Sequence, residues 1–157
     1  ARKLTSVNAQ VTVKMEYTPK VYQHSAGLIL YYDNMNYLYL RKYYSETLGQ
    51  SALSIIRLEN GEKTEYQDSR VPVGEEPIYL RLRISGRKTC FTWGLDGRKY
   101  ERIGPDFDTS RLSDEYCKYG EFTGTMAGMI CVDTMKHERW ADFDFFEYFV
   151  WDKEDEV

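Results

Sequence analysis

The stretch from Tyr119 to Tyr148, YGEFTGTMAGMICVDTMKHERWADFDFFEY, carries the clearest fold information in the chain. It begins with a loop between Gly120 and Gly124, continues as an apolar run over 125–131, and ends on an alternating segment over 141–148. Alternation with a period of two is typical of a half-buried strand. We therefore expect two strands joined by a polar excursion, the second with Phe143, Phe145 and Tyr148 facing a core and Asp142 and Asp144 facing away.

The first half of the chain shows the same kind of pattern. Residues Val7–Glu16 alternate and predict a long strand with one solvent-facing side, whereas Ala26–Asp33 is almost wholly apolar. A continuous apolar run of this length predicts a strand that is covered on both faces. Strands are also expected over Tyr37–Tyr44 and Leu53–Leu58, and Asn60-Gly61 is a strong hairpin signal that leads into a polar edge strand, 62–67.

The second half adds a predicted meander. Ile78, Leu80, Leu82 and Ile84 alternate with polar residues, and further strands are expected over 88–94 and 99–103. Gly104–Tyr119 is expected to be a longer connection with a helical turn or two around 108–116, and Trp151–Val157 a frayed acidic tail. Short strands with tight turns and no convincing helix predict an all-β sandwich of two antiparallel sheets.

Length and composition fit one domain spanning residues 1–157. The net charge of −4 and the mixed distribution of charges argue against a nucleic-acid partner, which needs a basic face. No apolar run approaches the roughly 18 residues that cross a membrane. Three unpaired cysteines favour a reducing compartment, so we expect a cytoplasmic protein. The abrupt start at Ala1 is expected for a processed chain or an excised domain.

Candidate chemical sites are few in this sequence. The two histidines lack metal-ligand spacing, and no nucleophile motif occurs. A calcium ion needs several oxygen ligands at one point, and Asp133, Asp142 and Asp144 are weak candidates for these ligands. The alternative is that they lie on a solvated strand face. Glycosidases use a pair of carboxylates, and acids cluster in one loop, but loop acids are usually solvated. These acids are Asp106, Asp108, Asp114 and Glu115.

Two aromatic residues stand apart from the expected core. Trp140 lies in the polar excursion and is the best candidate for stacking on a sugar ring, although most aromatics in such a chain pack in cores. Phe122 lies between glycines in a loop, where a large apolar side chain has little reason to be. It is either tucked onto the sandwich or offered to a neighbouring surface.

Several motifs, in the same order along the chain, resemble the C-terminal β-sandwich of glycoside hydrolase family 43 β-xylosidases. The resemblance covers about Val7 to Tyr148 and is marked by these segments: Ala26–Asp33 with Asn36–Leu40, Ile78–Ile84 with Leu95-Asp96-Gly97 and Ile103-Gly104-Pro105, Phe122-Thr123-Gly124, Gly128–Asp133, and Ala141–Tyr148. It departs from the family pattern at Glu121, where glycine is usual, and in the excursion Thr134–Trp140.

The resemblance implies a concanavalin A-like (jelly-roll) sandwich that follows a catalytic five-bladed propeller in the same polypeptide. Such enzymes release xylose, and some release arabinofuranose, from xylo-oligosaccharides with inversion, using three carboxylates of the propeller. This chain would then have no catalytic residue and no cofactor. Its loop Phe122-Thr123-Gly124 would narrow the substrate pocket of its own or, in a homo-oligomer, a neighbouring subunit. The alternatives are a free-standing carbohydrate-binding module and a purely structural or oligomerisation domain.

Overall fold

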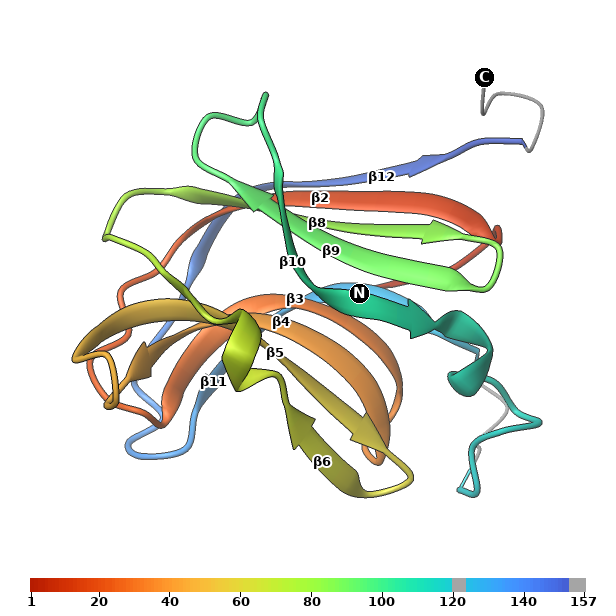
Figure 1. Ribbon diagram of the computed structural model, residues 1–157, viewed down its shortest axis with the longest axis horizontal. Coiled ribbons are helices and arrows are strands. Elements are labelled where there is room, and N and C mark those ends of the chain that lie inside the picture. The colour runs from red at the N-terminus through yellow and green to blue at the C-terminus, as the bar shows by residue number, and fades with distance from the viewer. Residues whose placement is uncertain (120–123, 153–157) are drawn as a thin grey trace.

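The chain folds into two antiparallel sheets that pack face to face, as expected for an all-β sandwich (Figure 1). The computed structural model describes residues 1–119 and 124–152. One sheet has seven strands in the order β1-β11-β3-β4-β5-β6, with β7 paired to β5. Its strands are β1 (Arg2–Lys3), β3 (His24–Asp33), β4 (Asn36–Ser45), β5 (Gln50–Glu59), β6 (Glu62–Glu65), β7 (Val71–Pro72) and β11 (Met126–Asp133).

The second sheet has five strands in the order β10-β9-β8-β2-β12. They are β2 (Asn8–Glu16), β8 (Ile78–Ser85), β9 (Lys88–Gly94), β10 (Glu101–Asp108) and β12 (Asp142–Val150). Two single-turn 3-10 helices, η1 (Gln67–Ser69) and η2 (Thr109–Arg111), interrupt the connections. Within the described ranges, no helix is long and apolar enough to cross a membrane.

Local sequence explains the tight hairpins of the seven-stranded sheet. Asn60 and Gly61 both have positive φ angles, 49° and 87°, which suit the two-residue turn that joins β5 to β6. The strands β3 and β4 run close together at Gly27, where an added Cβ would collide with the carbonyl oxygen of Leu40. Glycine at this position therefore allows a tight strand pairing.

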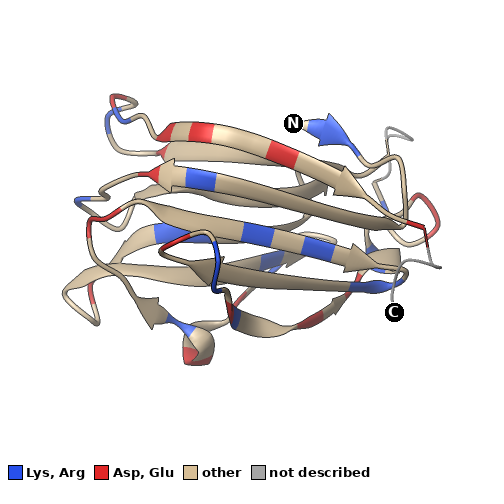
Figure 2. Cartoon of the chain, turned by 90° about the horizontal axis from the view of Figure 1, so that it is seen from above, with Lys and Arg blue, Asp and Glu red and all other residues tan. Residues whose placement is uncertain are grey.

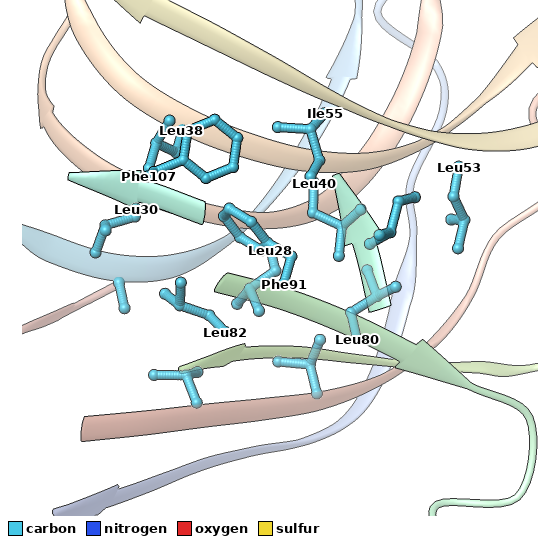
Figure 3. Packing of buried hydrophobic residues seen from close by; sticks show 14 of the residues in the cluster. Leu28, Leu30, Leu38, Leu40, Leu53, Ile55, Leu80, Leu82, Phe91 and Phe107 are labelled. Carbon is cyan, nitrogen blue, oxygen red and sulfur yellow. The ribbon is translucent and has the colours of Figure 1, made fainter. Parts of the chain in front are cut away.

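The core lies between the sheets and consists mainly of leucine, isoleucine and phenylalanine. Figure 3 shows leucines of β3 and β4 pointing toward those of β8 and toward Phe91 and Phe107. Leu28, Leu40, Leu80 and Leu82 are fully buried. Burying each such side chain contributes about 1.5–3 kcal/mol. The alternation expected for β8 is confirmed, because Tyr79, Arg81 and Arg83 point outward while the apolar residues between them are buried.

One prediction about the last strand was wrong. Phe143 packs against the core, but Phe145 is exposed and lies against Tyr79 on the outer side of the five-stranded sheet. The pairing of β12 with β2 shifts between Phe143 and Phe145, as at a β-bulge. Because one extra residue reverses the facing of all that follow, Phe146 turns inward in place of Phe145, and Tyr148 packs against the core as expected.

The alternation predicted for the first long strand is confirmed, because Ala9, Val11, Val13 and Met15 are buried while Gln10 and Lys14 are half-buried and Glu16 is exposed on the other side. The strand begins at Asn8, Val7 is exposed, and the outward-pointing Asn8 and Thr12 are buried. Strands β8 and β12 flank β2 on both sides. The Thr12 hydroxyl accepts a hydrogen bond from Arg81 Nε at 3.2 Å, and Asn8 Oδ1 accepts one from the Gly86 amide at 3.1 Å. The two buried polar side chains of this face, Asn8 and Thr12, therefore both have hydrogen-bond partners.

Two further expectations need correction. The strand expected to end at Ile103 continues through Gly104-Pro105 to Asp108, with an irregular pairing between Ile103 and Phe107 that accommodates the proline. Trp151, placed in a frayed tail, is buried, and the Arg83 guanidinium lies 4.7 Å from its ring centroid. All three cysteines lie within the described residues and are free thiols.

Candidate functional site

The connection between β10 and β11 is the segment that the sequence analysis associates with function. Its first turn, η2, is capped by Asp108, whose side chain accepts a hydrogen bond from the Ser110 amide at 3.0 Å. Arg87 Nη2 pairs with the same carboxylate at 2.8 Å. The hydrogen bonds from Arg87 and Ser110 lower the pKa of Asp108 to about 2.

The middle of the connection is tied to the β5–β6 hairpin. Glu59, at the end of β5, accepts hydrogen bonds from Arg111 Nη1 at 2.9 Å and from the Tyr116 hydroxyl at 2.5 Å. The Tyr116 contact with this carboxylate raises the pKa of the tyrosine. One residue further along the turn, Asn60 Oδ1 accepts from the Lys118 amide at 2.9 Å. We call Glu59, Arg111 and Tyr116 the Glu59 clamp.

A second set of contacts fixes the connection to β3 and to the core. The Tyr32 hydroxyl donates to Asp114, and the Thr125 hydroxyl donates to the Leu112 carbonyl at 2.6 Å. Leu112 and Cys117 join the core cluster. The described part of the connection, residues 109–119 and 124–125, is therefore held by side-chain contacts at several points.

Of the three residues in the predicted pocket loop, only Gly124 belongs to the described residues. Phe122 and Thr123 lie outside the described residues, so their predicted role stays a prediction. Gly124 has a positive φ of 75°, which strains any residue with a side chain. A Cβ at this position would lie 2.7 Å from Lys3 Cε. Glycine at 124 thus lets the chain turn closely against β1 as it leaves the loop.

The weak calcium candidates are not brought together. Both oxygens of Asp133 accept backbone N–H groups of the following excursion, from Met135, Lys136, Glu138 and Arg139 at 2.8–3.2 Å. Burial alone would raise the pKa of Asp133, but these backbone donors outweigh it and hold the pKa well below its usual range. Asp144 pairs with Lys14 at 2.6 Å. The described residues hold no group of three or more metal-binding side chains.

Trp140 lies where a ligand could reach it. Its side chain is 75% exposed, at the end of the excursion that Asp133 organises. It borders an open hollow of about 290 Å³ that is rich in charged groups. The hollow is lined by Glu16, Tyr17, Thr18, Lys20, Glu75, Arg139, Trp140 and Asp142.

The loop acids serve structural contacts. Asp106 pairs with Lys88 at 2.6 Å and with Arg102, and Asp114 accepts from Tyr32. The Glu59 clamp was missed by the sequence analysis. Glu59 and Tyr116 are 57 positions apart, and no local pattern connects them. The only hint in the sequence was that the β5–β6 turn is polar and that the connection contains one arginine, Arg111, and two tyrosines, Tyr116 and Tyr119.

One known protein family matches nearly the whole chain. Residues 1–149 match the family model described as the β-xylosidase C-terminal concanavalin A-like domain of glycoside hydrolase family 43. The chain belongs to this family. The expected resemblance is thereby confirmed over nearly the whole chain.

Two similar relatives of this chain are named as β-xylosidases. The chain is 32% identical over 149 residues to a xylan 1,3-β-xylosidase of a Vibrio species and 28% identical over 151 residues to a β-xylosidase of Bacillus subtilis. A crystal structure of xylan β-1,4-xylosidase from Bacillus halodurans superposes with a TM-score of 0.88 at 35% identity. Each comparison covers 94% of this chain but only 28% of the relative.

Proposed function

We propose that this family 43 C-terminal domain is a non-catalytic part of a glycoside hydrolase that acts on xylo-oligosaccharides or arabinofuranosyl side chains. In this proposal it packs on the catalytic propeller of the same polypeptide and presents residues 120–124 at the mouth of the substrate pocket. The observation that carries the proposal is the fixed base of this loop, held by the Glu59 clamp and by Tyr32. A rigid support is what a residue that shapes a pocket needs.

The chemistry of the carboxylates supports a non-catalytic role. A glycosidase needs a general acid whose pKa is raised and a second carboxylate across the scissile bond. The acids at the end of β10 and in the connection that follows it are used differently. Asp108 has a lowered pKa, and Asp106 and Asp114 are engaged by Lys88 and Tyr32 respectively. These groups hold the connection in place.

The test is the substitution Phe122→Ala in the full-length enzyme. Loss of an aromatic wall is expected to lower kcat/KM on short xylo-oligosaccharides by about tenfold or more, since small losses of positioning are costly. The matched control is Tyr119→Ala, which removes an exposed aromatic from the same connection three positions earlier. Unchanged kinetics for Phe122→Ala, or an equal loss for both variants, would show that Phe122 only packs on the domain.

A second function, sugar binding by the domain itself, is favoured by the hollow beside Trp140. An exposed indole can stack on a pyranose ring while charged side chains around it bind hydroxyl groups. Calorimetric titration of the chain with xylo-oligosaccharides should then show binding that is lost in Trp140→Ala. The control Met135→Ala removes another exposed apolar side chain of the same excursion and should leave binding intact. Absence of heat at millimolar sugar would exclude this function.

A further inference from the structure

His24 is a buried histidine at the start of β3, and its two ring nitrogens face different segments of the chain. The residue is only 6% exposed. Its Nδ1 accepts a hydrogen bond from the Lys20 amide at 3.2 Å. Its Nε2 lies 3.6 Å from Oδ1 of Asp133. A nitrogen that accepts a hydrogen bond carries no proton, so the ring in this arrangement is neutral, with its one proton on Nε2.

The His24–Asp133 pair lies where two loops meet the seven-stranded sheet. The two residues are paired positions of β3 and β11. The β2–β3 loop, residues 17–23, reaches the sheet at His24, and the polar excursion, residues 134–140, leaves the sheet at Asp133. The His24 ring therefore contacts the loop through one nitrogen and faces the anchor of the excursion through the other.

The same two loops form the walls of the hollow beside Trp140. Thr18 and Lys20 of the β2–β3 loop line this hollow together with Arg139 and Trp140 of the excursion. A second hollow, of about 400 Å³, reaches His24 and shares Lys20 and Arg139 with the first. The position of the β2–β3 loop therefore determines the shape of the Trp140 hollow.

Asp133 presents a permanent negative charge to the His24 ring. Its carboxylate accepts four backbone N–H groups, which hold its pKa well below the usual range. Histidine is the side chain that changes its charge between about pH 5 and 8. At 3.6 Å, Nε2 lies outside hydrogen-bond distance of Oδ1. A protonated ring is therefore attracted to Asp133 and has room to move closer to it.

Protonation has the opposite effect on the contact with Lys20. The added proton occupies Nδ1, the atom to which the Lys20 amide donates, so two N–H groups then point at each other. The amide loses its acceptor, and a buried amide without a partner is unfavourable. The ring and the β2–β3 loop must therefore separate. The charged ring keeps a favourable partner in Asp133, so the separation does not require the domain to unfold.

Other charged and titratable groups surround the ring. The charged residues that border the same hollow are Lys20, Lys136, Glu138 and Arg139. Figure 2 shows acidic and basic positions close together in the connections at the ends of the sandwich. On the β4 side, Tyr43 pairs with Ser25 and Lys42 with Ala26, so Tyr44 lies beside His24. Glutamate, lysine, arginine and tyrosine ordinarily change charge outside the histidine range. Burial lowers the pKa of Lys42, so a test has to distinguish Lys42 from His24.

We propose that His24 is a pH-sensitive latch for the β2–β3 loop. The neutral ring holds the loop through the Lys20 amide, and the protonated ring turns to Asp133 and releases it. The latch is a property of the fold and does not require the proposed function. Its consequence for ligands, a Trp140 hollow that changes shape with pH, rests on the second function proposed above.

NMR spectroscopy of this chain tests the latch at about pH 8 and about pH 5. At the higher pH, the ring nitrogen resonances of His24 should show a proton on Nε2 and none on Nδ1. On acidification, the protection of the Lys20 amide from hydrogen exchange, corrected for the intrinsic effect of pH, should fall by about tenfold or more. His24→Asn offers a short side-chain acceptor and does not titrate, so its Lys20 protection should be the same at both pH values.

His137→Asn is the matched control. It removes the only other histidine of the sequence, which is exposed and has a positive φ of 59° that asparagine tolerates. This variant should respond to pH as the wild type does. The proposal is wrong if Nδ1 carries the proton at the higher pH, or if Lys20 protection does not change on acidification. A response that persists in His24→Asn would also overturn it. If His24→Asn fails to fold, the ring and amide resonances of the wild type decide the question.

Calorimetric titration with xylo-oligosaccharides at the same two pH values separates the latch from sugar binding. Absence of binding at both pH values would remove the second function, while the Lys20 amide would still decide whether the latch exists. Weaker binding at the lower pH, abolished as a pH effect in His24→Asn, would support control of the hollow by the latch. Equal affinity at both pH values in a chain whose Lys20 amide is released would overturn that control.

Discussion

Lys42 offers the sharpest test of how this sandwich is stabilised. It lies on the inner side of β4, opposite Ala26 and Leu53, and is 0% exposed. Its Nζ is buried without a hydrogen-bond partner in the described part of the chain. Burial lowers the pKa of Lys42, and the carboxylates of Glu76 and Glu75 only partly offset this effect. The substitution Lys42→Met keeps the length of the side chain and removes the charge.

The expected change is a gain in stability. Replacing buried charged groups by apolar residues of similar volume is often neutral or stabilising by about 1–4 kcal/mol. Here the Lys42 ammonium lacks a close partner among the described residues. Glu75 is exposed and lies 3.9 Å from Lys20, so the attraction between Lys42 and Glu75 that the substitution removes is small. We expect Lys42→Met to raise the free energy of unfolding by about 1–3 kcal/mol at neutral pH.

The pH dependence gives the same prediction an independent signature. Because the pKa of Lys42 is lower in the folded state, the unfolded chain binds more protons between that value and 10.5. Stability of the wild-type chain should therefore rise with pH across this window. Lys42→Met should lack that rise, so the difference between the two proteins shrinks at alkaline pH.

Urea unfolding followed by tryptophan fluorescence, at about pH 7 and about pH 10, measures both effects. Lys63→Met, an exposed lysine of β6, is the control and should change stability by less than about 0.5 kcal/mol. If Lys42→Met is less stable than the wild type by more than about 1 kcal/mol, or keeps the alkaline rise, then the Lys42 ammonium is satisfied in the folded state and our reasoning fails.

Three other substitutions test the fold and the site. Glu59→Ala should release Arg111 and Tyr116 and make the β10–β11 connection more sensitive to limited proteolysis. The control Glu62→Ala, in the same hairpin, should not have this effect. Equal rates of cleavage in the two variants would contradict the role of the Glu59 clamp. Gly27→Ala should lower the unfolding free energy by about 1–3 kcal/mol, because the added methyl group meets the β4 backbone, and an unchanged denaturation midpoint would show that the strands separate freely. Asp108 has a pKa of about 2, below its unfolded value, so its contribution to stability is present above about pH 4 and is lost as the pH falls toward 2. Arg87→Met removes the partner of Asp108 and should lose less stability in an acid titration than the wild type. An identical acid transition in the two proteins would contradict this assignment.

Much of the fold could be predicted because it depends on patterns within a few residues. The alternation of Ile78, Leu80 and Leu82 fixes the facing of β8, and the two left-handed residues Asn60 and Gly61 fix a hairpin. The facing of Phe145 could not be predicted in the same way. A bulge opposite β2 reverses it, and the position of a bulge depends on the partner strand rather than on the alternation itself.

The candidate site depended even more on contacts that are distant in sequence. In the sequence Asp133 lies near other acidic residues and was a candidate calcium ligand. In the structure its carboxylate instead accepts hydrogen bonds from the backbone of the turn that follows it. The Glu59 clamp joins the end of β5 to the connection that follows β10. These segments become neighbours only once the two sheets have packed together, because β5 and β10 belong to different sheets. Position along a strand was therefore predictable from sequence, while the partner of each polar side chain was not.

The run from Ala26 to Tyr32 contributes apolar side chains to both sides of the seven-stranded sheet. One side of this run builds the core through Leu28 and Leu30, and the other side contributes Ile29 to a second buried cluster with Tyr39 and Ile56. These three residues are 7%, 5% and 6% exposed, so the chain itself buries apolar surface on both sides of the run. Because a continuous apolar run is typical of a strand that is covered on both faces, the sequence of this segment alone was enough to predict its burial.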